Sequence, residues 1–273
     1  MSWLHRYPPR RDARLRLVCF PHAGGSAAAY RSWSVGLPEW VEILGVQYPG
    51  RAERLGEPAR TSLPGLADEI AEALRGLADL PYVLFGHSMG AAIAYETARR
   101  LPEPAHLVVS GREAPRHSRH GTIHLGSEAD LLAALDRFGA TPPELLADPE
   151  MRELLLGVIA ADCELIETYA PDLAATPLRC PVTALLGDAD PGVTPREAAD
   201  WAAITSGPFR LNAFPGDHFF LLAQRDAVLR TMTDLLAGPG SQTDTRSAPA
   251  ARETADRLCS GDQTVPQGLG GSS

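Results

Sequence analysis

Residues 81–99 read PYVLFGHSMGAAIAYETAR, which places a strand pattern, a tight turn and a helix pattern in immediate succession. The apolar run 82–85 predicts a short buried strand, and 89–100 has the composition of a helix. Between them stands Gly86-His87-Ser88-Met89-Gly90, the Gly-x-Ser-x-Gly pattern of a nucleophile elbow. So sharp a turn leaves no room for bulk two residues before and after the serine. The sequence therefore predicts that Ser88 holds its hydroxyl above the edge of a sheet.

Strand and helix patterns alternate along most of the chain. Further apolar runs that predict strands lie at 15–20, 42–47, 106–110, 182–187 and 209–214, and helical patterns lie at 28–37, 63–77, 195–204 and 219–236. Near-continuous apolar strands that alternate with amphipathic helices are typical of a parallel sheet covered on both faces. We therefore predict an α/β fold with a mostly parallel central sheet flanked by helices.

The same patterns divide the chain into segments. We expect an N-terminal extension over 1–13 and one catalytic domain over 14–237. From about 127 to 170 the signals are only helical, as expected for a substrate lid inserted between two strands; an additional structural layer of helices is the alternative. Residues 238–273 are rich in Gly, Ser, Thr, Pro and Gln, so we expect a disordered C-terminal tail.

Composition excludes several classes of protein. The formal net charge of −9 over 273 residues argues against a general binder of nucleic acids or anionic membranes. The four cysteines are scattered without a CxxC pair, which fits a reducing compartment. The first residues lack the apolar stretch of a signal peptide. We expect a cytoplasmic protein that acts as a monomer, with neither a nucleic-acid nor a membrane partner.

A serine hydroxyl needs a base to remove its proton, and the base needs an acid to orient it. After a nucleophile elbow, these partners follow at later strand ends in the order Asp, His. The strand pattern 182–187 runs into Asp188 and Asp190, and 209–214 runs into Asp217 and His218. We predict His218 as the base. We favour Asp190 as the acid because a Gly-x-x-Asp turn carries it past the strand end; Asp188 is the alternative.

The loop after the first predicted strand reads FPHAGGS over 20–26. Adjacent glycines allow backbone N–H groups to approach a developing oxyanion. We predict the N–H groups of Ala23 and Met89 as the oxyanion donors, and we expect His22 and His87 to shape the surrounding loops. A phosphate-binding loop is the weaker interpretation, because the Gly-Lys-Ser/Thr ending is absent.

Three histidines, His117, His120 and His124, lie close together in the chain. Imidazoles are common zinc ligands, but neither cysteine nor paired carboxylates accompany these three at ligand spacing. We favour a solvated loop over a zinc site.

Four motifs together resemble those of the type II (external, editing) thioesterases, which accompany modular polyketide synthases and non-ribosomal peptide synthetases. The motifs are FPHAGGS at 20–26, YPGR at 48–51, GHSMG at 86–90 and GDHFF at 216–220. The resemblance extends over about 14–236 and includes the helical segment. It implies the α/β-hydrolase fold and the hydrolysis of acyl groups held on the phosphopantetheine arms of acyl or peptidyl carrier proteins.

The resemblance also implies roles for the predicted site residues. Ser88 would attack the thioester carbonyl, His218 would take its proton and Asp190 would hold the imidazole, while Ala23 and Met89 bind the oxyanion. This chemistry requires neither a metal nor an organic cofactor. Alternatives are a chain-releasing carrier-protein thioesterase, a stand-alone carboxylesterase and a non-catalytic module that binds carrier proteins.

Carrier proteins are usually acidic, and this chain is also acidic, so any electrostatic attraction between them must be local. The basic surface best placed for such a contact is the run that contains Arg112, Arg116 and Arg119. We favour a merely solvated arginine loop, and a docking surface for the carrier protein is the alternative.

Overall fold

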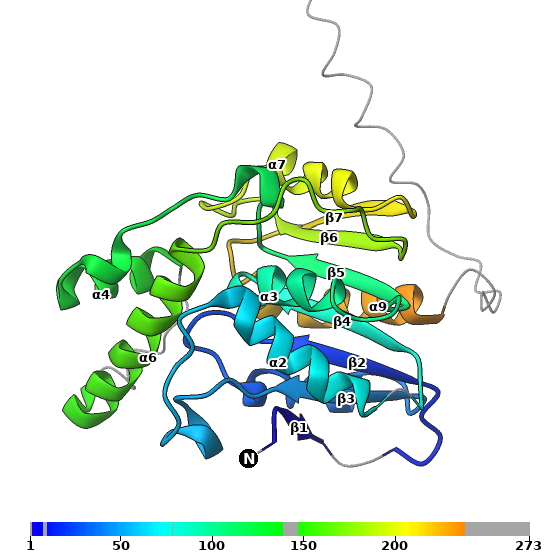
Figure 1. Ribbon diagram of the computed structural model, residues 1–273, viewed down its shortest axis with the longest axis horizontal. Helices are drawn as coiled ribbons and strands as arrows, with labels where there is room; N and C mark the ends of the chain where they lie inside the picture. The colour runs from blue at the N-terminus through cyan, green and yellow to red at the C-terminus, as the bar shows by residue number, and fades with distance from the viewer. Residues whose placement is uncertain (1, 8–9, 78, 139–146, 238–273) are drawn as a thin grey trace, which may run out of the picture. The chain divides into compact units, whose positions relative to one another are not determined.

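The computed structural model describes residues 2–7, 10–77, 79–138 and 147–237. Within these ranges, seven strands form a single sheet in the order β1-β3-β2-β4-β5-β6-β7 (Figure 1). The strands are β1 (Leu4–Arg6), β2 (Leu15–Phe20), β3 (Val41–Val46), β4 (Tyr82–His87), β5 (His106–Ser110), β6 (Val182–Gly187) and β7 (Phe209–Phe214). Every neighbouring pair is parallel except β1 and β3. The predicted mostly parallel sheet is confirmed.

The predicted strands are all present, and four of them have the predicted bounds. The exception to the prediction is β1, which lies within the segment that we treated as an N-terminal extension. Its three residues pair antiparallel with β3, Leu4 opposite Val46. Three residues are too few to show the alternation by which a strand is recognised in a sequence.

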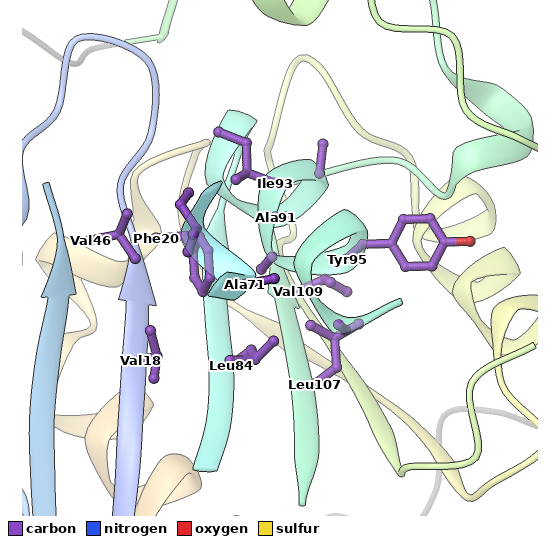
Figure 2. Packing of buried hydrophobic residues seen from close by; sticks show 14 of the residues in the cluster. Val18, Phe20, Val46, Ala71, Leu84, Ala91, Ile93, Tyr95, Leu107 and Val109 are labelled. Atoms are coloured by element: carbon purple, nitrogen blue, oxygen red, sulfur yellow. The ribbon is translucent and has the colours of Figure 1, made fainter. Parts of the chain in front are cut away.

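Helices cover both faces of the sheet, as predicted. On one face lie α2 (Leu63–Arg75) and α3 (Met89–Ala98), and on the other lie α1 (Trp33–Gly36) and α9 (Arg225–Ala237). Figure 2 shows the first of these cores, in which Val18 and Phe20 of β2 lie on the same side of the sheet as Ile93 of α3. Leu17 and Cys19 point to the opposite core, because successive side chains of a strand alternate between faces.

Three of the predicted helices are divided. The segment 28–37 forms a 3₁₀ turn, η1 (Ala27–Tyr30), and α1; 195–204 forms α7 (Pro195–Ala199) and η5 (Asp200–Ile204); and 219–236 forms α8 (Phe220–Ala223) and α9. The break between α8 and α9 falls at Gln224, whose φ of −101° and ψ of 24° are not helical.

The helical insertion lies between β5 and β6 in the chain. It contains α4 (Glu128–Phe138) and α6 (Pro149–Glu167), which stand beyond one end of the strands in Figure 1. The Asp148 carboxylate caps α6 by accepting hydrogen bonds from the N–H groups of Glu150 and Met151. Leu131 of α4 and Ile159 of α6 belong to a small apolar core that the two helices share. Both helices therefore occupy the segment for which we expected a lid.

The turn between β4 and α3 depends on two glycines. Ser88 has a φ of 55° and a ψ of −121°, a left-handed backbone conformation that a non-glycine residue adopts only under strain. A Cβ on Gly86 would lie less than 3.0 Å from the Gly90 carbonyl, and a Cβ on Gly90 would lie equally close to the Phe20 carbonyl. The predicted elbow is therefore present, and its glycines are required by backbone contacts on both sides.

The described residues contain no helix whose length and hydropathy would allow it to cross a bilayer. Residues 238–273, for which the sequence predicts a disordered tail, lie outside the described ranges.

Replacing Gly86 with alanine tests the packing of the elbow. The added Cβ would clash with backbone atoms of Gly90 and Ala91, which cannot rotate away. We expect G86A to lower the free energy of unfolding by about 1–3 kcal/mol or more, measured by urea denaturation.

A matched control is Gly157→Ala in α6, because nothing lies within 4 Å of the position of its Cβ. Alanine is a better helix former than glycine, so this variant should gain about 0.5–1 kcal/mol. An unchanged denaturation midpoint for G86A would contradict the account of the turn.

Candidate active site

The predicted site residues follow the carboxyl ends of four strands. Ala23 follows β2, Ser88 follows β4, Asp190 follows β6 and His218 follows β7. Because these strands are parallel, their carboxyl ends lie along the same edge of the sheet. Four loops that are distant in sequence therefore converge at that edge.

Asp190 and His218 are in direct contact. The Asp190 Oδ2 atom lies 2.8 Å from the His218 Nδ1 atom, and the Asp190 side chain is 0% exposed. Its other oxygen accepts a hydrogen bond from the Gly192 N–H at 2.8 Å. A carboxylate held this way accepts a hydrogen bond from the Nδ1–H group of the imidazole, which leaves Nε2 as the proton acceptor. The pair can thus orient a base toward the sheet edge.

The two other acids at this edge have different partners. Asp188 is exposed, and its Oδ1 accepts a hydrogen bond from the Gly216 N–H at 2.9 Å. Asp217 accepts one from the Phe219 N–H at 2.9 Å. Both acids therefore stabilise the turn that carries His218. In the described part of the chain, neither forms a hydrogen bond with the His218 ring.

The histidine ring lies beside the elbow. The ring centroids of His218 and His87 are 5.0 Å apart, and His87 directly precedes Ser88. Ser88 is partly exposed, whereas His87 is fully buried. Among the described residues no hydrogen bond joins the Ser88 hydroxyl to His218. Such contacts are often long or poorly aligned when no substrate is bound.

Two further imidazoles surround the site, and burial keeps both of them neutral. Desolvation holds the pKa of His87 well below its usual range, and its Nδ1 atom lies 3.0 Å from the Ser110 hydroxyl oxygen. Burial, with the nearby His218, lowers the pKa of His22 to about 4. Both side chains contact the loops of the site, as the sequence predicts.

The predicted oxyanion donors are unpaired. Within the described residues, neither the Ala23 N–H nor the Met89 N–H donates to a protein acceptor. Met89 is the first residue of α3, where helical N–H groups have no partner in their own helix. The N–H groups that follow Ala23 are occupied, Gly24 by Asp162 and Gly25 by the His22 carbonyl. Ala23 and Met89 are therefore free to donate to an oxygen of a ligand.

Sequence reasoning missed an ion pair beside this loop. Arg51 and Asp162 meet through two contacts, of 2.5 Å between Nη1 and Oδ2 and 2.6 Å between Nη2 and Oδ1. Arg51 belongs to the YPGR motif, which singled out this residue but did not indicate its function. Asp162 is one of several acids in α6, and nothing in the sequence distinguishes it from the others.

A second missed contact comes from the end of α4. The Phe138 ring lies 4.9 Å from the His218 ring, centroid to centroid. Arg137 donates to the Pro191 carbonyl at 3.4 Å, in the turn that follows Asp190. The insertion therefore contacts the acid and base loops as well as the oxyanion loop. Phe138 carries no motif that could have identified it.

The histidine cluster is dispersed among different partners. His117 lies 2.6 Å from Asp200, and His124 lies 2.6 Å from Glu167. The ring of His120 instead contacts the Glu167 carbonyl at 3.0 Å. No group of three or more His, Cys, Asp and Glu residues that could hold a metal ion occurs within the described part of the chain.

The expected basic surface is largely compensated. The Arg112 side chain is only 14% exposed and pairs with Glu113, so its inclusion in a docking surface was wrong. Arg119 pairs with Glu197, and Arg116 lies 3.9 Å from Asp200. Acidic partners within the same chain thus offset the charges that were expected to attract a carrier protein.

A groove of about 600 Å³ lies between α6 and the segment 49–59. Arg51, Leu55 and Leu154 are among its lining residues, whereas none of the described residues that line it is Ser88, Asp190 or His218. The groove is therefore separate from the predicted catalytic residues.

Comparison with known proteins agrees with this geometry. The family model of the thioesterase domain matches residues 15–236. The thioesterase PikA5 of Streptomyces venezuelae is 39% identical over 256 residues, which cover 92% of this chain and 89% of that protein. A probable cadicidin biosynthesis thioesterase of Streptomyces griseus is 41% identical over 255 residues, covering 91% of this chain and 68% of the relative.

A solved structure is similar over nearly its whole length. The type II thioesterase BorB from the borrelidin biosynthetic cluster superimposes with a TM-score of 0.80 at 40% identity, covering 86% of this chain and 99% of BorB. The family match spans more than half of the chain, and BorB superimposes on most of it. This chain therefore belongs to the thioesterase family and has the α/β-hydrolase fold of the type II thioesterases.

Proposed function

We propose that this protein hydrolyses acyl thioesters held on the phosphopantetheine arms of carrier proteins, and so clears blocked polyketide or non-ribosomal peptide synthases. A solved structure similar to this chain is that of YbtT, a type II thioesterase from the yersiniabactin NRPS/PKS biosynthetic pathway, at 29% identity and a TM-score of 0.77. The observation that carries the proposal is the buried 2.8 Å contact between Asp190 and His218 beside the strained Ser88 elbow. Three groups in these positions can activate a serine for acyl transfer.

In the first half of the reaction, the Ser88 Oγ atom attacks the thioester carbonyl carbon. His218 Nε2 takes the hydroxyl proton, and Asp190 stabilises the imidazolium through the Nδ1 proton. The carbonyl oxygen becomes an oxyanion, which the N–H groups of Ala23 and Met89 bind. When the carbon–sulfur bond breaks, His218 returns the proton to the departing pantetheine sulfur, and the acyl group stays on Ser88.

In the second half, water attacks the acyl-Ser88 ester. His218 takes a proton from the water and gives it to the Ser88 oxygen as the ester bond breaks, which releases a carboxylic acid and restores the enzyme. Every proton transfer uses these side chains and water, so the scheme draws on no metal or organic cofactor. One chain supplies all of these groups, and we propose that it acts as a monomer.

We assign α4 and α6 the role of a lid over the site. Support comes from the 4.9 Å contact between the Phe138 and His218 rings and from the packing of Ile159 against Gly24. Helices that cover the site give the acyl chain an apolar surface.

Substitution of Ser88 tests the function most simply. We expect S88A to lower kcat/KM for a short acyl-pantetheine thioester by about 10³-fold or more, because the members of such a triad act as a unit. The control is Ser34→Ala. It removes a hydroxyl from α1, which covers the face of the sheet opposite α3. S34A should retain wild-type turnover.

Comparison of two substrates separates the proposal from a carboxylesterase. Wild-type enzyme should prefer the thioester to the oxygen ester of the same acyl group, and an acyl-carrier protein should be hydrolysed too. Preference for the oxygen ester, or a fully active S88A, would refute the proposed function.

Substitution of the two aspartates tests the assignment of the acid. Asp190→Asn should cost on the order of 10³ to 10⁴ in kcat, because an amide cannot hold His218 in the same tautomer. Asp188→Asn keeps an oxygen that can accept from the Gly216 N–H, so its kcat should remain within about threefold of wild type. The reverse ranking of the two kcat values would make Asp188 the acid.

A further inference from the structure

The ion pair between Arg51 and Asp162 joins two elements that are distant in sequence. Arg51 lies in the loop after β3, and Asp162 lies on α6 of the insertion, 111 residues further along the chain. The two side chains are only 8% and 4% exposed. Their two short contacts form the bidentate geometry in which a guanidinium and a carboxylate interact most strongly. The pair is therefore held in a defined geometry and is largely shielded from water.

The same pair holds the backbone of the oxyanion loop at two points. Asp162 Oδ2 accepts a hydrogen bond from the Gly24 N–H at 2.7 Å. Arg51 Nη1 donates to the Gly25 carbonyl at 3.1 Å. Both bonds involve a charged partner, which makes them stronger than ordinary backbone hydrogen bonds. An amide and a carbonyl of this short loop are thus fixed by side chains from outside it.

These bonds control the direction of the Ala23 N–H. Gly24 has a φ of 76°, a conformation that glycine adopts readily, and its amide plane begins at the Ala23 carbonyl. The Gly25 N–H closes the turn on the His22 carbonyl at 2.9 Å. Because the backbone of Gly24 and Gly25 is held by these bonds, the backbone of Ala23 has little freedom to rotate about φ and ψ. The Ala23 N–H lies in the same peptide plane as the His22 carbonyl, so the bond from Gly25 to that carbonyl also restricts the N–H.

The helix α6 also packs directly against the loop. A Cβ on Gly24 would lie 2.9 Å from the Cγ1 atom of Ile159, which is one turn of α6 before Asp162. Any larger residue at this position would push the helix and the loop apart. The insertion therefore packs against the loop that carries the oxyanion donor.

We propose that Asp162 and Arg51 are positioning residues that hold the Ala23 N–H in place to bind the oxyanion. A helix of the insertion thereby completes the oxyanion hole. This inference rests on the proposed acyl-transfer function of the same site. Neither side chain is assigned contact with the reacting atoms. Their effect on the reaction passes through Gly24 and Gly25.

The variant Asp162→Asn tests this role, because it removes the charge of the pair and weakens the bond to Gly24. We expect kcat for a short acyl-pantetheine thioester to fall about 10- to 100-fold, less than the 10² to 10³ that follows from removing an oxyanion donor entirely. KM should change by less than about twofold, because the displaced N–H matters most in the transition state.

The matched control is Glu42→Gln. Glu42 pairs with Arg16 at 2.6 Å, and both side chains are as buried as those of the first pair, at 8% and 7% exposure. This second pair lies near the amino ends of β2 and β3, at the opposite edge of the sheet. E42Q leaves Arg16 paired with Asp79, so the free energy of unfolding is measured for both variants, and E42Q should keep kcat within about twofold. An equal loss of kcat in both variants would show that the Asp162 pair acts only through stability and would overturn the inference.

A second measurement does not depend on thioester hydrolysis. A fluorophosphonate probe reacts with an activated serine when Oγ bonds to phosphorus and fluoride leaves, and the phosphoryl oxygen develops charge in the oxyanion hole. D162N should label Ser88 about 10-fold or more slowly than wild type, and E42Q should label at the wild-type rate. If wild type labels but hydrolyses no thioester, the proposed function fails while the labelling ratio still tests the pair.

If D162N does not fold, Arg51→Lys serves instead, because lysine keeps the charge but cannot form both contacts with Asp162. R51K should show the same slower labelling, with KM nearly unchanged. Labelling of a folded D162N or R51K at the wild-type rate overturns the inference. Failure of wild type itself to label at Ser88 overturns both the inference and the proposed function.

Discussion

The backbone strain at Ser88 and the two glycines that accommodate it determine how the site is built. A φ of 55° at a serine is unfavourable, and it persists because β4, α3 and the loop after β2 enclose the turn. Gly90 lies directly against the Phe20 and Pro21 carbonyls, so the oxyanion loop begins beside the elbow. One close approach of backbones therefore places the nucleophile, the free N–H of Met89 and the loop that carries Ala23 together.

Around this turn, burial keeps the imidazoles of His22 and His87 neutral, and His218 is left as the candidate base. His22 and His87 stay neutral because desolvation lowers the pKa of each, and the carboxylate of Asp190 is held between His218 and the Gly192 N–H. A buried carboxylate is costly unless its oxygens are paired, and here both are. His218, which Asp190 contacts at 2.8 Å, is therefore the imidazole in position to act as the base.

The sequence predicted what depends on local pattern. The core strands were evident from continuous apolar runs, and the elbow from its paired glycines. The choice of Asp190 over Asp188 remains a prediction about catalysis, although Asp190 is the one that contacts His218. Chain order and strand ends identified the turn, because parallel strands bring their carboxyl ends to one edge, and the Gly-x-x-Asp pattern favoured Asp190 within it.

What could not be predicted depends on contacts between distant segments. The strand β1 is too short for periodicity, and the pair of Arg51 with Asp162 joins positions that no spacing rule connects. Phe138 contacts His218 only because α4 folds back over the acid turn. The ion pairs of the arginine loop could not be predicted for the same reason, since Asp200 and Glu197 approach it from another part of the chain.

The central claim is that the reaction proceeds through an acyl group on Ser88. The most direct test mixes the enzyme with excess acyl-pantetheine thioester, quenches it in acid within milliseconds and measures the intact mass and the modified peptide. The account predicts a single acyl adduct on the peptide that contains Ser88, formed before the acid product and lost as the acid accumulates. Hydrolysis at full rate with no adduct, or an adduct on another residue, would contradict it.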